Sequence, residues 1–100
     1  MSALDDRARA HVRIDGRAQG VGFRMSTAHE AYRRQLTGWV RNLDSGAVEA
    51  VFEGGREEVA AIVRWCEDGP PGAFVRDLHV WWDEPLEHFA RFEVRPTANA

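Results

Sequence analysis

Residues 16–24 read GRAQGVGFR and place three glycines shortly before an arginine. Glycine lets backbone N–H groups turn toward a common point, and the start of a helix adds unpaired donors and the positive end of its dipole. Arg24 adds a permanent cation whose planar fork matches phosphate oxygens. No Asp or Glu occurs between Gly16 and His29, so a bound anion would supply the counter-charge. The segment predicts an anion-binding cradle, with a plain strand-to-helix turn carrying an exposed arginine as the alternative.

A second segment, GWVRN at residues 38–42, opens a predicted strand after the first predicted helix. The two-residue period of a strand places Val40 and Asn42 on one face. Asparagine is depleted in strand interiors, so Asn42 needs a specific role. Its amide either caps the turn at residues 44–46 or reaches a ligand, and for Asn42 taken alone the turn is favoured.

The elements that position these segments follow from the spacing of apolar residues. Two-residue alternation predicts strands at residues 9–15, 38–43, 47–53, 74–82 and 88–95. Helical spacing predicts one helix from residue 22 or 23 to 35 and a second over 56–68. This is the order of a ferredoxin-like α/β sandwich, β-α-β-β-α-β with an extra C-terminal edge strand. We expect both helices on one face of an antiparallel sheet, with strand 38–43 beside strand 9–15.

Individual residues within these elements carry further expectations. Ala31 and Tyr32 belong to a thin apolar stripe on the first helix. Cys66 falls on the apolar stripe of the second helix, so we expect a core thiol rather than a nucleophile. Trp81 and Trp82 are adjacent in a strand and must face opposite sides of the sheet, one of them in the core.

Length, charge and composition narrow the class of protein. One hundred residues make a single domain, expected over residues 9–95 with disordered tails at 1–8 and 96–100. A net charge of −3 argues against a nucleic-acid surface, and no apolar run approaches a membrane span or a signal peptide. The single cysteine excludes an internal disulfide, and the histidines lack metal-ligand spacing. We therefore expect a cytoplasmic monomer with no cofactor, no metal, and no nucleic-acid or membrane partner.

Taken together, residues 16–24 and 38–42 resemble the paired motif of the acylphosphatase family. The family pattern is a G-x-V-Q-G-V-x-F-R loop followed by G-W-V-x-N, at the separation found here. The turn at residues 44–46 and the sequence GPPGA at 69–73 agree as well, and the similarity covers residues 9–95.

The resemblance implies both a fold and an activity. Acylphosphatases have a ferredoxin-like fold and hydrolyse the carboxyl–phosphate bond of acyl phosphates to a carboxylate and inorganic phosphate, without a metal. Asn42 would orient the attacking water, and the expected partner is a small-molecule acyl phosphate. The phosphoryl group would be held by the loop residues Gln19, Gly20, Val21, Gly22, Phe23 and Arg24.

Three residues depart from the family pattern. Ala18 stands where valine is usual, and residues 34–37 read RQLT where Leu-Gly-Leu-Thr is common. Gln35 thus occupies a position where glycine takes a left-handed cap at low cost. Arg34 replaces a core leucine. Because both candidate catalytic residues are intact, these departures concern stability more than chemistry.

Other functions share parts of this pattern. RNA-recognition domains have the same element order but need an aromatic-rich third strand and a basic surface. Residues 48–53, VEAVFE, are instead acidic with one aromatic. A phosphate-sensing module, or a carbamoyl-phosphate-handling domain like that of the hydrogenase-maturing carbamoyltransferases, would share the cradle. The lack of a zinc-finger segment and of a large catalytic domain argues against the carbamoyltransferase alternative.

Overall fold

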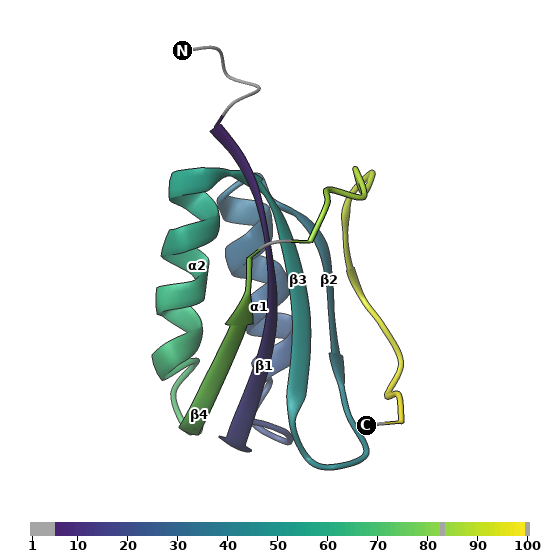
Figure 1. Ribbon diagram of the computed structural model, residues 1–100. Helices are drawn as coiled ribbons and strands as arrows, with labels where there is room; N and C mark the ends of the chain where they lie inside the picture. The colour runs from purple at the N-terminus through teal and green to yellow at the C-terminus, as the bar shows by residue number, and fades with distance from the viewer. Residues whose placement is uncertain (1–5, 83, 100) are drawn as a thin grey trace.

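A five-stranded sheet and two helices form two layers (Figure 1). The computed structural model describes residues 6–82 and 84–99. No helix in these ranges is long and apolar enough to cross a membrane. The arrangement confirms the predicted ferredoxin-like α/β sandwich. In chain order its elements are β1 (Arg7–Arg17), α1 (Phe23–Arg33), β2 (Thr37–Asn42), β3 (Val48–Gly55), α2 (Arg56–Asp68), β4 (Phe74–Trp81) and β5 (Phe92–Val94).

The strands are ordered β4-β1-β3-β2-β5, so β3 lies between β1 and β2 and runs antiparallel to both. The expectation that β2 lies directly beside β1 is therefore wrong. The crossover through α1 leaves one strand position open, and the hairpin from β2 returns β3 into it. The extra edge strand is present, but it pairs parallel to β2 through Gly38↔Phe92 to Val40↔Val94. The sheet is thus mixed rather than wholly antiparallel.

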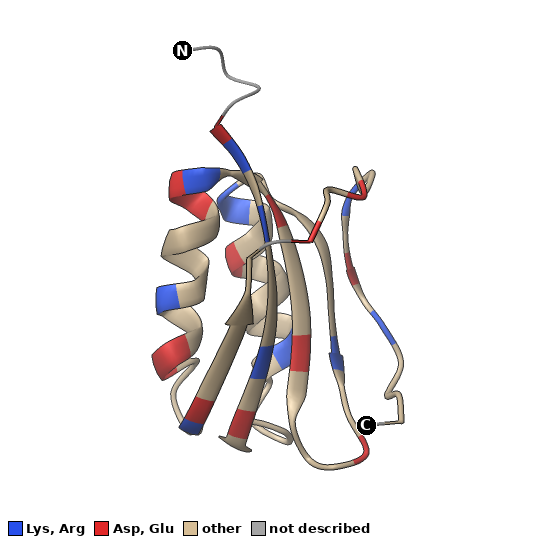
Figure 2. Ribbon diagram, viewed as in Figure 1, with Lys and Arg blue, Asp and Glu red and all other residues tan. Residues whose placement is uncertain are grey.

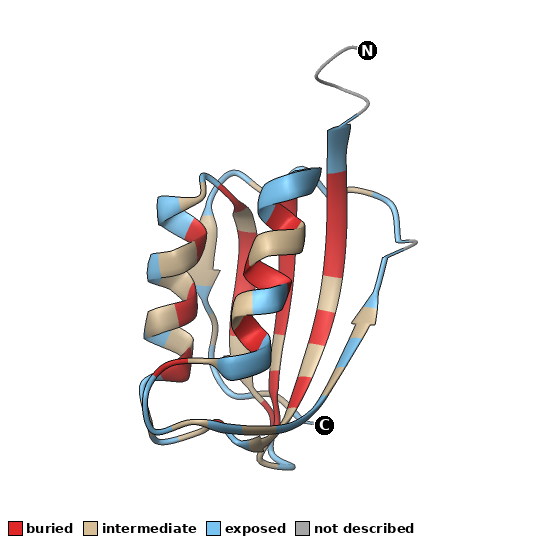
Figure 3. Ribbon diagram, turned by 90° about the vertical axis from the view of Figure 1, so that its left-hand side faces the viewer, coloured by how far each residue is buried: buried red, intermediate tan, exposed pale blue. Residues whose placement is uncertain are grey.

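The core lies between the sheet and the two helices, which cover the same face (Figure 3). The inward residues of β1 and β3 are fully buried, as their two-residue period predicts. The buried side of α2 repeats at helical spacing and includes Cys66. Burial raises the pKa of the Cys66 thiol, with a smaller contribution from the Glu30 carboxylate, so the thiol stays protonated. Cys66 is the core residue that the sequence predicts.

The buried stripe of α1 differs from the predicted one. Tyr32 is 84% exposed, whereas Thr27 is fully buried beside Phe23 and Ala31. Thr27 can enter the core because its hydroxyl donates to the backbone oxygen of Phe23 at 2.7 Å, which satisfies its polar atom within the helix. Hydrophobicity ranks tyrosine above threonine as a buried residue. The buried stripe predicted from the sequence is therefore rotated by a fraction of a turn from the observed one.

The end of α1 is closed by a left-handed residue that is not glycine. Gln35 has φ 58°, and the helix ends at Arg33, two residues before the predicted end. The N–H of Leu36 donates to Ala31 O at 2.9 Å and the N–H of Gln35 donates to Tyr32 O at 3.1 Å. This is the Schellman arrangement, in which glycine is the usual left-handed residue.

We expect Gln35→Gly to stabilise the fold by about 1 kcal/mol, because glycine adopts the left-handed region without the Cβ clash that other residues meet there. Urea unfolding of both proteins measures the difference as a shifted midpoint at constant slope. Gln35→Ala is the matched control, since alanine keeps the Cβ and should bring no such gain. An equal gain from both variants would contradict the explanation by backbone conformation.

Arg34 has a partner that the sequence does not reveal. Its guanidinium donates to Glu30 at 3.2 Å and to Glu58 at 3.1 Å, which joins α1 to α2. The half-buried Arg34 side chain therefore links the two helices.

The tryptophans at the end of β4 correct another expectation. Trp81 is 48% exposed and Trp82 is 42% exposed, so neither lies in the core. Leu78 and Val80 supply the core contacts of β4. Trp81 lies on the outer face beside His11, with ring centroids 5.1 Å apart, and Trp82 lies beyond the end of the strand.

The two ends of the chain reach further into the domain than predicted. β1 begins at Arg7, and Ala8 is already buried. At the other end, the N–H of Ala98 donates to Asn42 O at 3.0 Å and the N–H of Asp44 donates to Ala98 O at 2.9 Å. Residues 1–5 and 100 of the predicted tails, and residue 83 of the predicted turn, lie outside the described residues.

The outer face of the sheet is built from paired charges rather than from a second helix layer. Figure 2 shows acidic segments on β3 flanked by basic segments on β1 and β2. Glu53 is 1% exposed and accepts hydrogen bonds from Arg9 at 2.9 Å and from the N–H groups of Glu87 and His88 at 2.7 and 2.9 Å. One carboxylate thus holds the segment between β4 and β5 against the sheet.

These donors determine how Glu53 responds to pH. Burial alone would raise the pKa of its carboxyl, but the hydrogen bonds from Glu87, Arg9 and His88 hold that pKa below its ordinary value. A carboxyl with a lowered pKa in the folded state stabilises the fold above its unfolded-state pKa, and this stabilisation is lost as the pH falls through the folded-state pKa.

We expect Glu53→Gln to destabilise the fold by about 2 kcal/mol, because it removes the buried carboxylate that binds Arg9 and leaves Arg9 with the exposed carboxylates of Glu84 and Glu87. It should also weaken the loss of stability on acidification. Urea unfolding at neutral and acidic pH measures both effects. Glu67→Gln, at an exposed helix position, is the control and should change little. An acid dependence identical to that of the parent protein would contradict the role assigned to Glu53.

Candidate functional site

The glycine-rich loop between β1 and α1 leaves the first helical N–H groups free. Gly20 and Gly22 have φ 82° and 76°, and an added Cβ at either would meet nothing within 4 Å. Backbone conformation rather than lack of space therefore calls for glycine at these two positions. Gly22 is the N-cap residue and has no side chain to cap the helix. The helical hydrogen bonds start with the N–H of Ser26 donating to Gly22 O at 2.9 Å.

No side chain or carbonyl of the described chain accepts a hydrogen bond from the N–H groups of Phe23, Arg24 or Met25. No acidic residue occupies the first turn of α1 either. Unpaired donors at the positive end of a helix dipole form a site that favours an anion. The Gly-rich segment is therefore open to an anion and is not a closed turn.

Gln19 ties this loop to the hairpin that joins β2 and β3. Its side-chain amide donates to Leu43 O at 2.8 Å and to Ala47 O at 2.9 Å. The sequence placed Gln19 in the loop but gave no sign of this contact, because its acceptors lie 24 and 28 residues away. The side chain of Gln19 fixes the distance between the loop and the end of β2.

Two other predicted loop residues direct their side chains away from the anion-binding side. Phe23 is 2% exposed and meets the ring of Trp65 edge-on, with centroids 5.8 Å apart. Val21 packs against the core and lies next to Gly72. Their contribution to a site is therefore limited to the backbone. Ala18 is fully buried.

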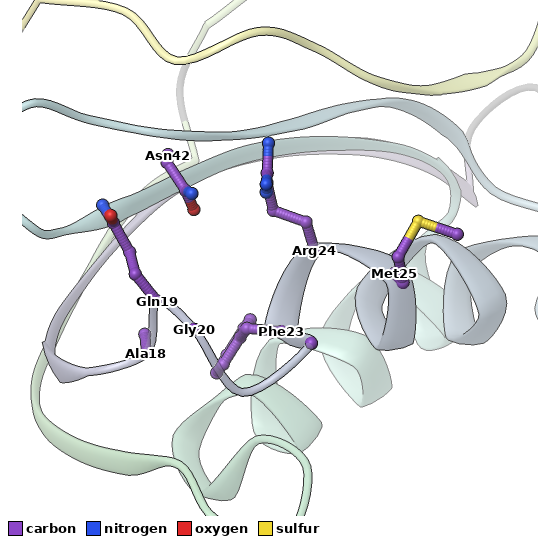
Figure 4. A pocket seen from close by; sticks show the side chains of 8 residues that line it. Ala18, Gln19, Gly20, Phe23, Arg24, Met25 and Asn42 are labelled. Carbon is purple, nitrogen blue, oxygen red and sulfur yellow. The ribbon is translucent and has the colours of Figure 1, made fainter.

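The loop and the end of β2 enclose a pocket of about 130 Å³, which we call the loop pocket. Figure 4 shows the side chains of Arg24 and Asn42 pointing into the same space from α1 and β2. The volume is below the roughly 300–1,000 Å³ of sites for drug-sized ligands, so the pocket suits a small group. It is lined by Ala18, Gln19, Gly20, Gly22, Phe23, Arg24, Met25 and Asn42.

The loop pocket contains a cation, the Arg24 guanidinium, that has no counter-ion within the described chain. No carboxylate lines it. Within the described chain, the Arg24 guanidinium takes part in no hydrogen bond or ion pair. A cation in the first turn opposes the helix dipole, which costs a few tenths of a kcal/mol to about 1 kcal/mol. This unfavourable placement is relieved when an anion binds between the guanidinium and the free N–H groups.

The side chain of Asn42 does not cap the adjacent turn. In the described residues that turn is closed by Gly46 N–H donating to Leu43 O at 3.0 Å, Leu43 N–H donating to Ala47 O at 2.8 Å, and Ala47 N–H donating to Ser45 Oγ at 3.4 Å. The backbone of Asn42 is held on both sides, by β3 and by Ala98. The backbone of Asn42 is thus fixed, while its side-chain amide makes no hydrogen bond within the described residues, which favours the ligand over the turn.

Comparison with known proteins identifies the family. The family model described as Acylphosphatase matches residues 10–94. The chain belongs to the acylphosphatase family. The acylphosphatase of Trichormus variabilis is 55% identical over 91% of this chain and 89% of its own. That of Nostoc sp. is 58% identical over 87% of this chain and 85% of its own.

A solved structure supports the same assignment to the acylphosphatase family. The acylphosphatase from Coxiella burnetii superposes with a TM-score of 0.89 at 36% identity, over 95% of this chain and 99% of that one. At this coverage the likeness extends over both layers of the fold.

Met25 is the pocket residue that the sequence did not suggest. It follows Arg24 directly, lines the loop pocket and is 68% exposed. A methionine directly after the candidate cation, in the first turn of the predicted helix, was the available signal in the sequence.

Proposed function

We propose that the chain is an acylphosphatase that hydrolyses the carboxyl–phosphate bond of acyl phosphates to a carboxylate and inorganic phosphate. The observation that supports this most directly is the loop pocket. In a space suited to one phosphoryl group it combines Arg24, which has no ion-pair partner among the described residues, the free N–H groups at the start of α1, and the free side-chain amide of Asn42.

Binding of the phosphoryl group is assigned to the loop. N–H groups of residues 19–24, those at the start of α1 in particular, donate to the non-bridging oxygens, and the Arg24 fork donates to them from the side. Negative charge stays on these oxygens in the loose transition state of phosphoryl transfer. The donors are already fixed by the fold, so little reorganisation accompanies the reaction.

Attack on phosphorus is assigned to a water held by Asn42. A neutral amide is a poor base, so its contribution is to place the water in line with the departing carboxylate. The water oxygen bonds to phosphorus, the P–O bond to the acyl group breaks, and the carboxylate leaves with the bonding electrons. Both protons of the water stay with the product, one of them passing to a phosphoryl oxygen, so that dihydrogen phosphate forms. A carboxylate is a weak base and leaves without a general acid, so the mechanism calls for neither a histidine nor a metal ion.

The setting that we propose is a cytoplasmic monomer. This one chain supplies the loop N–H groups, Arg24 and Asn42, so the proposed chemistry needs no group from a partner. The single cysteine fits a reducing compartment, since it cannot form a disulfide within the chain.

The activity is tested by measuring phosphate release from acetyl, benzoyl and carbamoyl phosphate, with a chelator present. Release from the acyl phosphates is the expected result, and no release from any of the three would contradict the proposal. Hydrolysis in ¹⁸O-water then tests the site of attack. The label enters inorganic phosphate if water attacks phosphorus and enters the carboxylate if it attacks the carbonyl carbon.

A further inference from the structure

A second cavity adjoins the loop pocket and shares one residue with it. This cavity, which we call the outer groove, has a volume of about 370 Å³ and lies between α1, Trp65 of α2 and the two prolines that follow α2. It differs from the loop pocket in character, since it has no arginine and several apolar walls. It is lined by Met25, Ser26, His29, Trp65, Pro70 and Pro71, together with Glu30.

The direction of attack relates the two cavities. In an in-line reaction the leaving group departs on the side of phosphorus opposite the attacking water. Figure 4 shows Asn42 and Met25 on opposite sides of Arg24. With water at Asn42 and phosphorus at Arg24, the acyl group leaves toward Met25, which borders the outer groove.

The lining of the outer groove indicates which acyl groups it accepts. Met25 offers a flexible thioether, and Trp65 is held by its edge contact with Phe23 at 5.8 Å. Pro70 and Pro71 complete the apolar wall, and methionine and tryptophan both favour contact with an aromatic ring.

The one carboxylate at the outer groove, Glu30, is already engaged. Arg33 and Arg34 contact it at 3.3 and 3.2 Å. These arginines do not line the groove, so its lining offers no free cation for a second anionic group on the substrate.

We infer that the outer groove is the acyl subsite of this enzyme and binds uncharged aromatic or aliphatic acyl groups in preference to small or anionic ones. This inference rests on the proposed hydrolysis of acyl phosphates and adds the substrate class. Benzoyl phosphate fills both cavities, whereas acetyl phosphate occupies the loop pocket alone.

The test compares benzoyl phosphate with acetyl phosphate in a variant that fills the groove. Ser26 lines the outer groove but not the loop pocket, and its hydroxyl has no hydrogen bond recorded among the described residues. We expect Ser26→Phe to lower kcat/KM for benzoyl phosphate about tenfold, the order of effect that a single methylene has in an apolar pocket. The values for acetyl phosphate, and inhibition by inorganic phosphate, should stay unchanged.

Two further variants make the comparison decisive. His29→Ala removes a wall of the groove and should reduce the preference for benzoyl phosphate, again with acetyl phosphate unaffected. Tyr32→Ala lies on the same helix outside the groove and should change neither substrate. Equal effects of Ser26→Phe on both substrates, or no effect on either, would overturn the inference. A parent protein inactive on both substrates but able to bind inorganic phosphate would instead contradict the proposed function.

Discussion

Arg24→Ala is expected to lower kcat/KM for benzoyl phosphate by at least about 10³-fold, the lower end of what an arginine contributes to phosphoryl transfer in other enzymes. The guanidinium is the cation of the loop pocket, and no other basic residue lines it. Its loss leaves the helix N–H groups as the remaining donors. Inorganic phosphate should therefore no longer bind measurably in a calorimetric titration.

The stability of the same variant separates a functional role from a structural one. Arg24 has no recorded partner in the described chain and opposes the dipole of α1. Its removal should leave the unfolding free energy unchanged or raise it by a few tenths of a kcal/mol. Arg24→Lys, which keeps the charge but loses the planar fork, should recover only part of the activity. Full activity of the alanine variant would rule out the proposed binding mode.

Asn42→Ala is expected to lower kcat by about 10²–10³, as removal of one preorganised polar group does in other active sites. Phosphate affinity should remain close to that of the parent protein, because Arg24 and the loop N–H groups are untouched. Single-turnover kinetics with benzoyl phosphate and a phosphate titration measure the two quantities separately.

The control for Asn42→Ala is a substitution by aspartate, whose side chain has nearly the same shape as that of asparagine. Asn42→Asp places a negative charge beside the phosphoryl group, so it should weaken phosphate binding as well as turnover. Stability should change little in either variant, because the adjacent turn is closed by backbone hydrogen bonds. A normal kcat for Asn42→Ala would remove the water-orienting role from the mechanism.

The two motifs and the element order could be predicted because they depend on local sequence. Residues 16–24 and the strand that ends in Asn42 appear in the structure on the expected elements, and the period of α2 predicts its buried side. The predicted contact between β1 and β2 failed for a different reason. Element order alone does not say whether the crossover through α1 brings β2 directly beside β1 or leaves one strand position open, which β3 then fills.

Side-chain contacts between distant segments could not be predicted from the sequence, for a physical reason. The amide of Gln19 could hydrogen-bond to any nearby carbonyl, and only the folded chain selects Leu43 and Ala47. Glu53 reads as an exposed acid at a strand end, yet the segment after β4 buries it. The outer groove likewise joins α1 to the residues after α2, a juxtaposition that no sequence period encodes.

The contact of Ala98 with the backbone of Asn42 affects the order in which the site is assembled during synthesis. The loop between β1 and α1 and the hairpin that Gln19 contacts leave the ribosome before the second half of the chain. The outer edge of β2 gains its last hydrogen bonds only when Ala98 has emerged. The end of β2, including Asn42, therefore gains its last backbone hydrogen bonds only when the chain is nearly complete.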